Sequence, residues 1–84
     1  MKYIIGTTGD SDELRAFVFD EKLQHSHVAA QKGIRAVRAG FYAVDGDKVF
    51  AGGESYSLDL RSDAYQDEPL IKIALQQQNQ KEQR

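Results

Sequence analysis

The chain has 84 residues, with 13 acidic and 11 basic side chains and a formal net charge of −2. Hydrophobic residues make up 40% of it and charged residues 29%, which is typical of one soluble globular domain and excludes the disordered class. Because cysteine is absent, disulfides and thiolate metal sites are excluded. No apolar run approaches the roughly 20 residues that a membrane-spanning helix needs, so we expect no membrane insertion.

Two short apolar stretches near the N-terminus predict a β-hairpin. Residues 2–5 are β-branched and aromatic, and residues 6–12 hold almost every turn-forming residue type. Residues 13–19 read as the second strand, and its last four residues are apolar on both faces, which favours cover on both sides at that end. Gly6 comes too early for the apolar region of a signal peptide, which needs about 7–15 residues, so we expect a cytoplasmic protein.

Residues 23–32 predict a short helix. Leu23, His27, Val28 and Ala30 fall on one side of it at helical spacing, and Gly33 follows at the position of a C-terminal cap. A helix of this length is marginal alone, so we expect it to dock on the sheet.

The most strand-like region is residues 34–44, whose alternate sets are both mainly apolar, as expected of a long central strand. Gly40 within it marks either a bulge or a close approach of another backbone segment. Residues 45–48, Asp-Gly-Asp-Lys, predict a hairpin turn, and residues 49–51 predict the returning strand.

Residues 55–60 alternate cleanly, which predicts a strand with one buried face and with Ser55, Ser57 and Asp59 on the solvent face. Asp67 is the predicted cap of a final helix, with Pro69 in its first turn. The apolar stripe of that helix ends at Leu75. We therefore expect one domain over residues 1–75 and a polar, frayed or disordered tail over residues 76–84.

The predicted fold is α+β in the order β-β-α-β-β-β-α. It is an antiparallel sheet of four to five strands with two helices on one face.

Four short motifs resemble sites for metal binding, nucleophilic catalysis, calcium binding or phosphate binding. His25 and His27 diverge on a helix and have no further ligand motif, so we expect one to pack and the other to be exposed. Residues 53–57 resemble a nucleophile elbow, but the last glycine is a serine and the context is a strand. Residues 45–47 lack the later ligands of a calcium loop, and residues 6–9 lack the lysine of a phosphate-binding loop. We therefore predict no enzyme, no cofactor, no metal and no catalytic residue.

The distribution of charge carries more information than these motifs. Lys32, Arg35 and Arg38 follow one another without an acidic residue between them, and with Tyr42 they predict an alternative function, nucleic-acid binding by a basic and aromatic platform. The sequence pI of about 5.6 disfavours this alternative, since nucleic-acid-binding domains are usually strongly basic.

Three short segments resemble small uncharacterised proteins that bacterial prophages encode. They are 39–41 (AGF), 53–58 (GESYSL) and 70–71 (LI), and the resemblance covers residues 23–75. It implies a bacterial accessory protein of a mobile element, with no assigned activity and no site residue to carry over.

The main prediction is therefore a non-enzymatic protein-interaction module whose partner is another protein or a second copy in a homodimer. Short sheets have edges that a small chain can hardly cover, which favours such pairing. The candidate interaction surface consists of Lys32, Arg35, Arg38, Tyr42, Ser55, Ser57 and Asp59.

Overall fold

The structure is a computed structural model that describes residues 1–82, with side chains as far as residue 78. These residues form six strands and two helices, so the α+β class is confirmed. In chain order the elements are β1 (Lys2–Thr8), β2 (Arg15–Phe19), α1 (His25–Lys32), β3 (Ile34–Asp45), β4 (Lys48–Gly52), β5 (Glu54–Ser55), β6 (Leu60–Arg61) and α2 (Ala64–Glu82).

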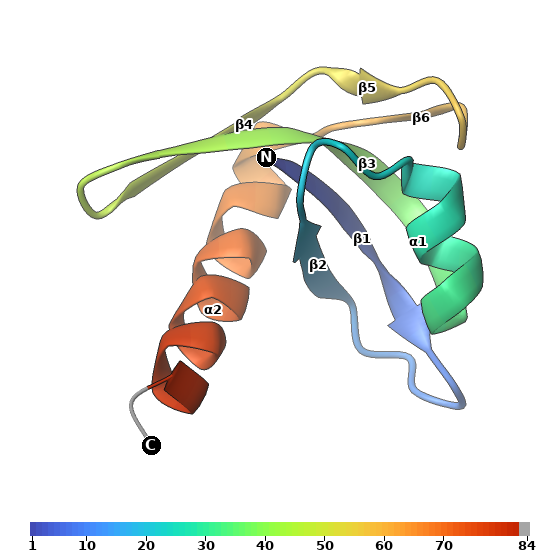
Figure 1. The fold of residues 1–84 in the computed structure, drawn as a ribbon, viewed down its shortest axis with the longest axis horizontal. Helices are drawn as coiled ribbons and strands as arrows, with labels where there is room; N and C mark the ends of the chain where they lie inside the picture. The colour runs from blue at the N-terminus through green and yellow to red at the C-terminus, as the bar shows by residue number, and fades with distance from the viewer. Residues whose placement is uncertain (83–84) are drawn as a thin grey trace.

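The first four strands form one antiparallel sheet in the order β2-β1-β3-β4 (Figure 1). Both predicted hairpins are confirmed. Ile4 of β1 pairs with Phe17 of β2, and β3 returns as β4 through the predicted Asp-Gly turn, in which Asp45 pairs with Lys48. The strands β2 and β4 are therefore the two edges of the sheet, and β1 lies inside it.

The two helices cover opposite faces of the sheet, so the prediction that they share one face is wrong (Figure 1). Tyr3 and Ile5 of β1 pack with Ile71 of α2, whereas Ile4 between them packs with Val28 of α1. Neighbouring residues on a strand point to opposite faces. Because β1 is apolar on both faces, each face needs its own cover, and one helix supplies each.

Helix α1 begins at His25, two residues later than predicted, after Gln24 in an extended conformation. It ends as predicted at Gly33, whose φ of 64° is the left-handed conformation that glycine adopts most easily. The buried side of α1 also differs from the predicted side, which held Leu23, His27, Val28 and Ala30. The side chains that α1 buries are His25, Val28 and Ala29.

Strand β3 contains a bulge, which lies at Val37 and not at Gly40, the residue for which a bulge was one of two alternatives. Ile5 of β1 pairs with Arg38, but the next residue, Gly6, pairs with Ala36, so Val37 is the extra residue. Both Ala36 and the later Ala39 pack on the face that α1 covers. The bulge thus reverses the side-chain alternation in the middle of β3.

Gly40 meets the other expectation, a close approach. A Cβ atom built on it would lie 2.6 Å from the carbonyl oxygen of Gly52 and 3.1 Å from the Cβ of Ser62. At this position of β3, only glycine leaves room for the Gly52 carbonyl and the Ser62 side chain without displacing them.

The predicted strand over residues 55–60 is wrong. Instead, β5 and β6 form a two-stranded hairpin, and residues 56–59 form the turn between them. Leu58 and Leu60 pack against the cluster beneath α1, as the alternation suggested, but Tyr56 is 90% exposed. The turn therefore breaks the alternation after Ser55, which is buried.

Helix α2 begins at Ala64 and is capped by Asp63, not by Asp67 as predicted. The Asp63 Oδ1 accepts a hydrogen bond from the N–H of Gln66 at 3.3 Å, which is the geometry of an N-cap. Pro69 consequently lies in the second turn. The helix also continues past Leu75 as far as Glu82, so the predicted frayed tail is helical over residues 76–82; residues 83–84 lie outside the described residues.

Candidate functional site

The predicted run of bases does not form one surface. Lys32 is exposed in the last turn of α1. The Arg35 guanidinium instead donates hydrogen bonds to the Thr7 hydroxyl at 3.2 Å and to the carbonyls of Gly9 at 3.1 Å and Ser11 at 3.4 Å. Arg35 thereby fastens the loop of the first hairpin.

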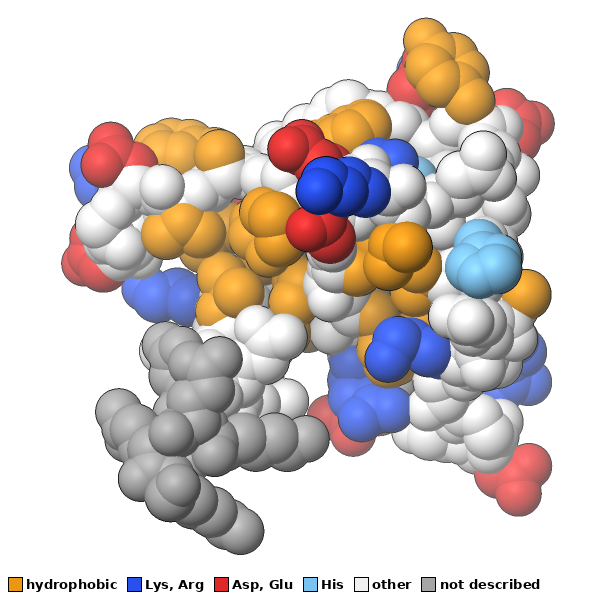
Figure 2. All heavy atoms as spheres, viewed as in Figure 1, with side chains coloured by type: hydrophobic (Ala, Val, Ile, Leu, Met, Phe, Trp, Pro, Cys, Tyr) orange, Lys and Arg blue, Asp and Glu red, His pale blue; other side chains and the backbone are white. Residues whose placement is uncertain are grey.

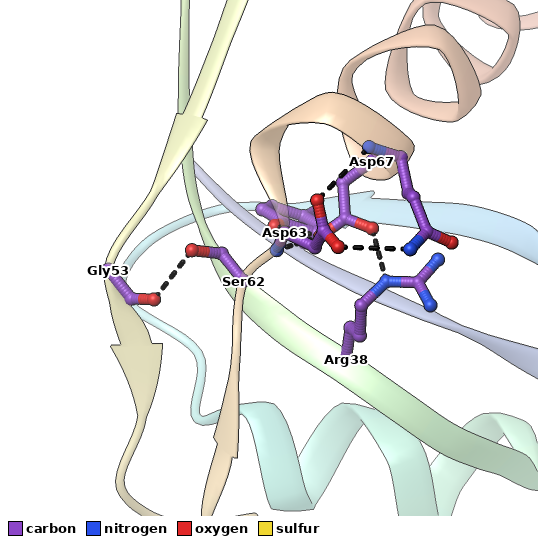
Figure 3. Close-up of polar contacts among 7 residues, drawn as sticks. Arg38, Gly53, Ser62, Asp63 and Asp67 are labelled. Carbon is purple, nitrogen blue, oxygen red and sulfur yellow. Dashed lines mark hydrogen bonds and ion pairs between the residues drawn. The ribbon is translucent and has the colours of Figure 1, made fainter.

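Arg38 turns towards α2 (Figure 3), and the buried Tyr42 packs with Ile71 of the same helix. The Arg38 Nε lies 2.5 Å from Asp67 Oδ1. The Tyr42 ring packs edge-on against Tyr3, with 6.5 Å between the ring centroids, and burial raises the pKa of Tyr42. Neither side chain is placed where a nucleobase could stack on it.

Asp67 is the centre of a buried hydrogen-bond network (Figure 3). Its exposed fraction is 0%, and its Oδ2 accepts hydrogen bonds from the Tyr3 hydroxyl at 2.5 Å and from the Asp63 N–H at 2.8 Å. Burial and the bond to the Asp67 carboxylate raise the pKa of Tyr3 far above its usual value. The network joins β1, β3 and the start of α2. Because solvent does not reach the carboxylate, its role is to hold α2 on the sheet.

The other half of the predicted surface, Ser55, Ser57 and Asp59, does not share one exposed face. The buried Ser55 Oγ accepts a hydrogen bond from the Leu58 N–H at 3.3 Å inside the β5–β6 turn. The Ser57 Oγ accepts one from the Ser26 N–H at 3.1 Å and so ties this turn to α1. Asp59 has a φ of 55° at the tip of the turn.

The two histidines divide as expected, since His25 is buried and His27 is exposed. The His25 ring lies edge-on between Phe19 and Phe41, with centroid distances of 5.4 and 5.7 Å. Its Nε2 is 2.9 Å from the carbonyl oxygen of Gly40, which only accepts hydrogen bonds, so Nε2 carries the proton. Burial lowers the pKa of His25.

Among the side chains of residues 1–78, no three of His, Asp or Glu come together closely enough to hold a metal ion. Over residues 1–82, neither helix combines the length and the apolar character that crossing a membrane requires.

The two edges of the sheet differ in how their backbone is covered. On β4, the Ala51 N–H donates a hydrogen bond to Glu68 Oε2 at 2.8 Å, so a side chain of α2 occupies a backbone donor of that edge. On β2, no hydrogen bond joins the backbone to any element except β1, as far as the backbone to residue 82 and the side chains to residue 78 are described. The strand β2 has no proline and no bulge; of the features that usually protect an edge strand, it has only its short length and one charged side chain, Arg15. Its outer edge is open.

A groove of about 520 Å³ runs beside this open edge. One side is residues 13–18, in and just before β2, and the other is α2. The helix contributes Leu70, Ile73, Ala74, Gln77 and Gln78, and Lys32 of α1 completes the lining. Ile73 is 51% exposed. Figure 2 shows a notch between α2 and the sheet, with Lys and Arg side chains on the sheet side of it.

The charged side chains that line the groove are Arg15, Lys32 and Glu13. The Arg15 guanidinium lies over the Phe17 ring, 5.2 Å from its centroid, and donates a hydrogen bond to the Thr8 hydroxyl at 2.8 Å. Two cations and one carboxylate give the groove a positive excess, whereas the whole chain has a net charge of −2.

Of the predicted surface residues, Lys32 alone lines this groove. The sequence nevertheless held a signal for it. Residues 16–19 are apolar on both faces, which predicts cover on both sides. This short strand also has no proline and no bulge to prevent pairing at its edge. The exposed Ile73 next to Lys72 was a second signal, because it widens the apolar stripe of α2 beyond what the sheet buries.

Comparison with protein-family models, with curated proteins and with solved structures finds no match for this chain. The resemblance to prophage-encoded proteins therefore stays a prediction.

Proposed function

We propose that this chain is a non-enzymatic protein-interaction module that binds an extended segment of another protein as an additional strand beside β2. The observation that carries the proposal is the contrast between the two sheet edges. Glu68 occupies the Ala51 amide on β4, while the outer edge of β2 has no such partner among the described residues.

Strand addition uses the backbone for affinity and alternate side chains for specificity. An added segment would pair with the free N–H and C=O groups of β2, each bond contributing about 0.5–1.5 kcal/mol net. Every second side chain of that segment would enter the groove and cover Leu70, Ile73 and Ala74 of α2. Helix α2 would thus pack against an added strand that the described residues do not supply.

Selection from a library of short linear peptides tests the proposal. We expect the enriched peptides to shift the backbone amide resonances of residues 15–19 in NMR spectra. Ile73→Lys on the floor of the groove should weaken their binding. Phe50→Lys is the matched control, because Phe50 is 53% exposed and lies on the other edge strand, β4.

Failure to enrich any peptide would contradict the proposal, as would peptides whose resonance shifts lie outside β2 and α2. Pairing of β2 with a second copy is the competing outcome. It would appear as a dimer in light scattering whose formation Ile73→Lys abolishes and peptide does not affect.

A further inference from the structure

A strand added beside β2 would meet two rows of side chains of different chemistry. Ala16 and Val18 belong to the cluster that α2 covers, whereas Phe17 belongs to the cluster on the α1 face. The exposed Leu14 shares the alternation of Ala16 and Val18, and Ile73 of α2 lies across the groove from this row. The row on the α2 face is therefore apolar throughout.

The row on the α1 face holds the cation Arg15 next to Phe17, and the two cations of the groove lining lie on this side. Arg15 lies on this face, because its guanidinium stacks on Phe17. Lys32, at the end of α1, lines the groove with it. Within the described residues, no ion pair engages either cation. Glu13 supplies the single carboxylate of the lining, before β2 begins.

We infer that the segment bound by β2 is an acidic one, in which apolar side chains alternate with Asp or Glu; this inference rests on the proposed function. The apolar side chains would face α2, and the carboxylates would face Arg15 and Lys32. Opposite charges on directly facing residues of two strands stabilise their pairing, and like charges oppose it.

A second copy of this chain matches that description poorly. The strand β2 carries one charged residue, Arg15. Self-pairing would therefore bring another guanidinium, and no carboxylate of the strand, to the two cations of the groove. The partner that fits the charge is a different chain.

Two synthetic peptides test the inference directly. One alternates valine with glutamate and the other alternates valine with lysine, and both are long enough to span β2. We expect the glutamate peptide to bind at least about tenfold more tightly at low salt, measured by fluorescence anisotropy, and the difference to shrink as salt screens the charges. Lys32→Glu should remove most of this preference. Lys48→Glu, the same charge change on the opposite edge strand, should preserve it.

The outcomes separate the inference from the proposed function. Equal affinity of the two peptides, with both shifting the amide resonances of β2, would contradict the acidic partner and leave strand addition standing. A preference for the lysine peptide would also overturn the inference. If neither peptide shifts those resonances, strand addition at β2 is itself contradicted.

Discussion

Glu68 of α2 accepts a hydrogen bond from the backbone N–H of Ala51 in β4 and so occupies one donor at that edge of the sheet, whereas the described residues provide no such partner at the β2 edge. The neighbouring Asp67 anchors the same turn of α2 to Tyr3 and Arg38. Two adjacent carboxylates of one helix therefore perform separate tasks: one fixes the helix to the interior strands, and the other protects an edge.

Glu68→Ala should destabilise the fold and expose the β4 edge. It leaves the partly buried Ala51 N–H without its acceptor, which should lower the free energy of unfolding by about 1–2 kcal/mol. Urea unfolding measures this change, and light scattering should show new self-association. Asp12→Ala, at an exposed loop carboxylate, is the control and should change the stability by less than about 0.5 kcal/mol.

Asp67→Asn should cost more than removal of the hydroxyl that donates to it. The substitution leaves the Arg38 guanidinium without its counter-charge in a largely buried site, so we expect a loss of about 3 kcal/mol or more. Tyr3→Phe removes one hydrogen bond and leaves two, so its expected cost is about 1–2 kcal/mol. Urea unfolding of the two variants gives the comparison, and equal losses would contradict a network centred on the carboxylate.

The stability should fall as the pH drops below about 6.5, the usual pKa of histidine. Burial lowers the pKa of His25 in the folded state, so in this range the unfolded chain takes up a proton that the folded chain does not. The loss should proceed until the pH reaches the folded-state pKa and then level off.

The measurement compares urea unfolding of the natural chain with that of His25→Gln from neutral pH to mildly acidic pH. The difference in stability between the two should shrink as the pH falls. His27→Gln is the matched control at an exposed site and should keep the pH dependence of the natural chain. A dependence that follows His27 would contradict the role given to His25.

Gly40→Ala should destabilise the protein by about 1–3 kcal/mol, because its Cβ would overlap the carbonyl oxygen of Gly52 at 2.6 Å. Gly52→Ala is the control on the other side of the same contact, since its Cβ would meet no atom within 4 Å. Thermal unfolding of the two variants should separate them clearly. Equal melting temperatures would show that β3 and β4 can move apart at this point.

Local signals predicted the hairpins and the end of the first helix, because a turn or a cap depends on residues next to one another. The Asp45-Gly46 turn and Gly33 are such cases. The turn over residues 56–59 was not predicted, because Tyr56, Leu58 and Leu60 alternate with polar residues as in a strand. The Ser55 hydroxyl accepts a hydrogen bond from the backbone of the turn and the Ser57 hydroxyl accepts one from the Ser26 N–H of α1, and neither bond follows from alternation.

The placement of the helices was wrong for a different reason. Residues 16–19 and 34–44 are apolar on both faces of their strands. This pattern predicts cover on both faces of the sheet, and therefore one helix on each face, rather than two helices on the same face. The candidate surface failed at Arg38, because the strict alternation of a strand does not reveal an extra residue such as Val37. The partner of Arg38, Asp67, lies 29 residues away in the sequence, so no local pattern identifies it.

The position of α2 in the chain has a consequence for synthesis. This helix follows all the strands, yet it covers the face on which Tyr3 and Ile5 are buried. When the strands have emerged from the ribosome, Ile71 is still inside it. That face of the newly synthesised sheet therefore stays exposed to solvent until α2 has emerged as well. The folding of this face therefore waits for α2, and a nascent chain stalled before α2 would expose an apolar sheet face that a chaperone could bind.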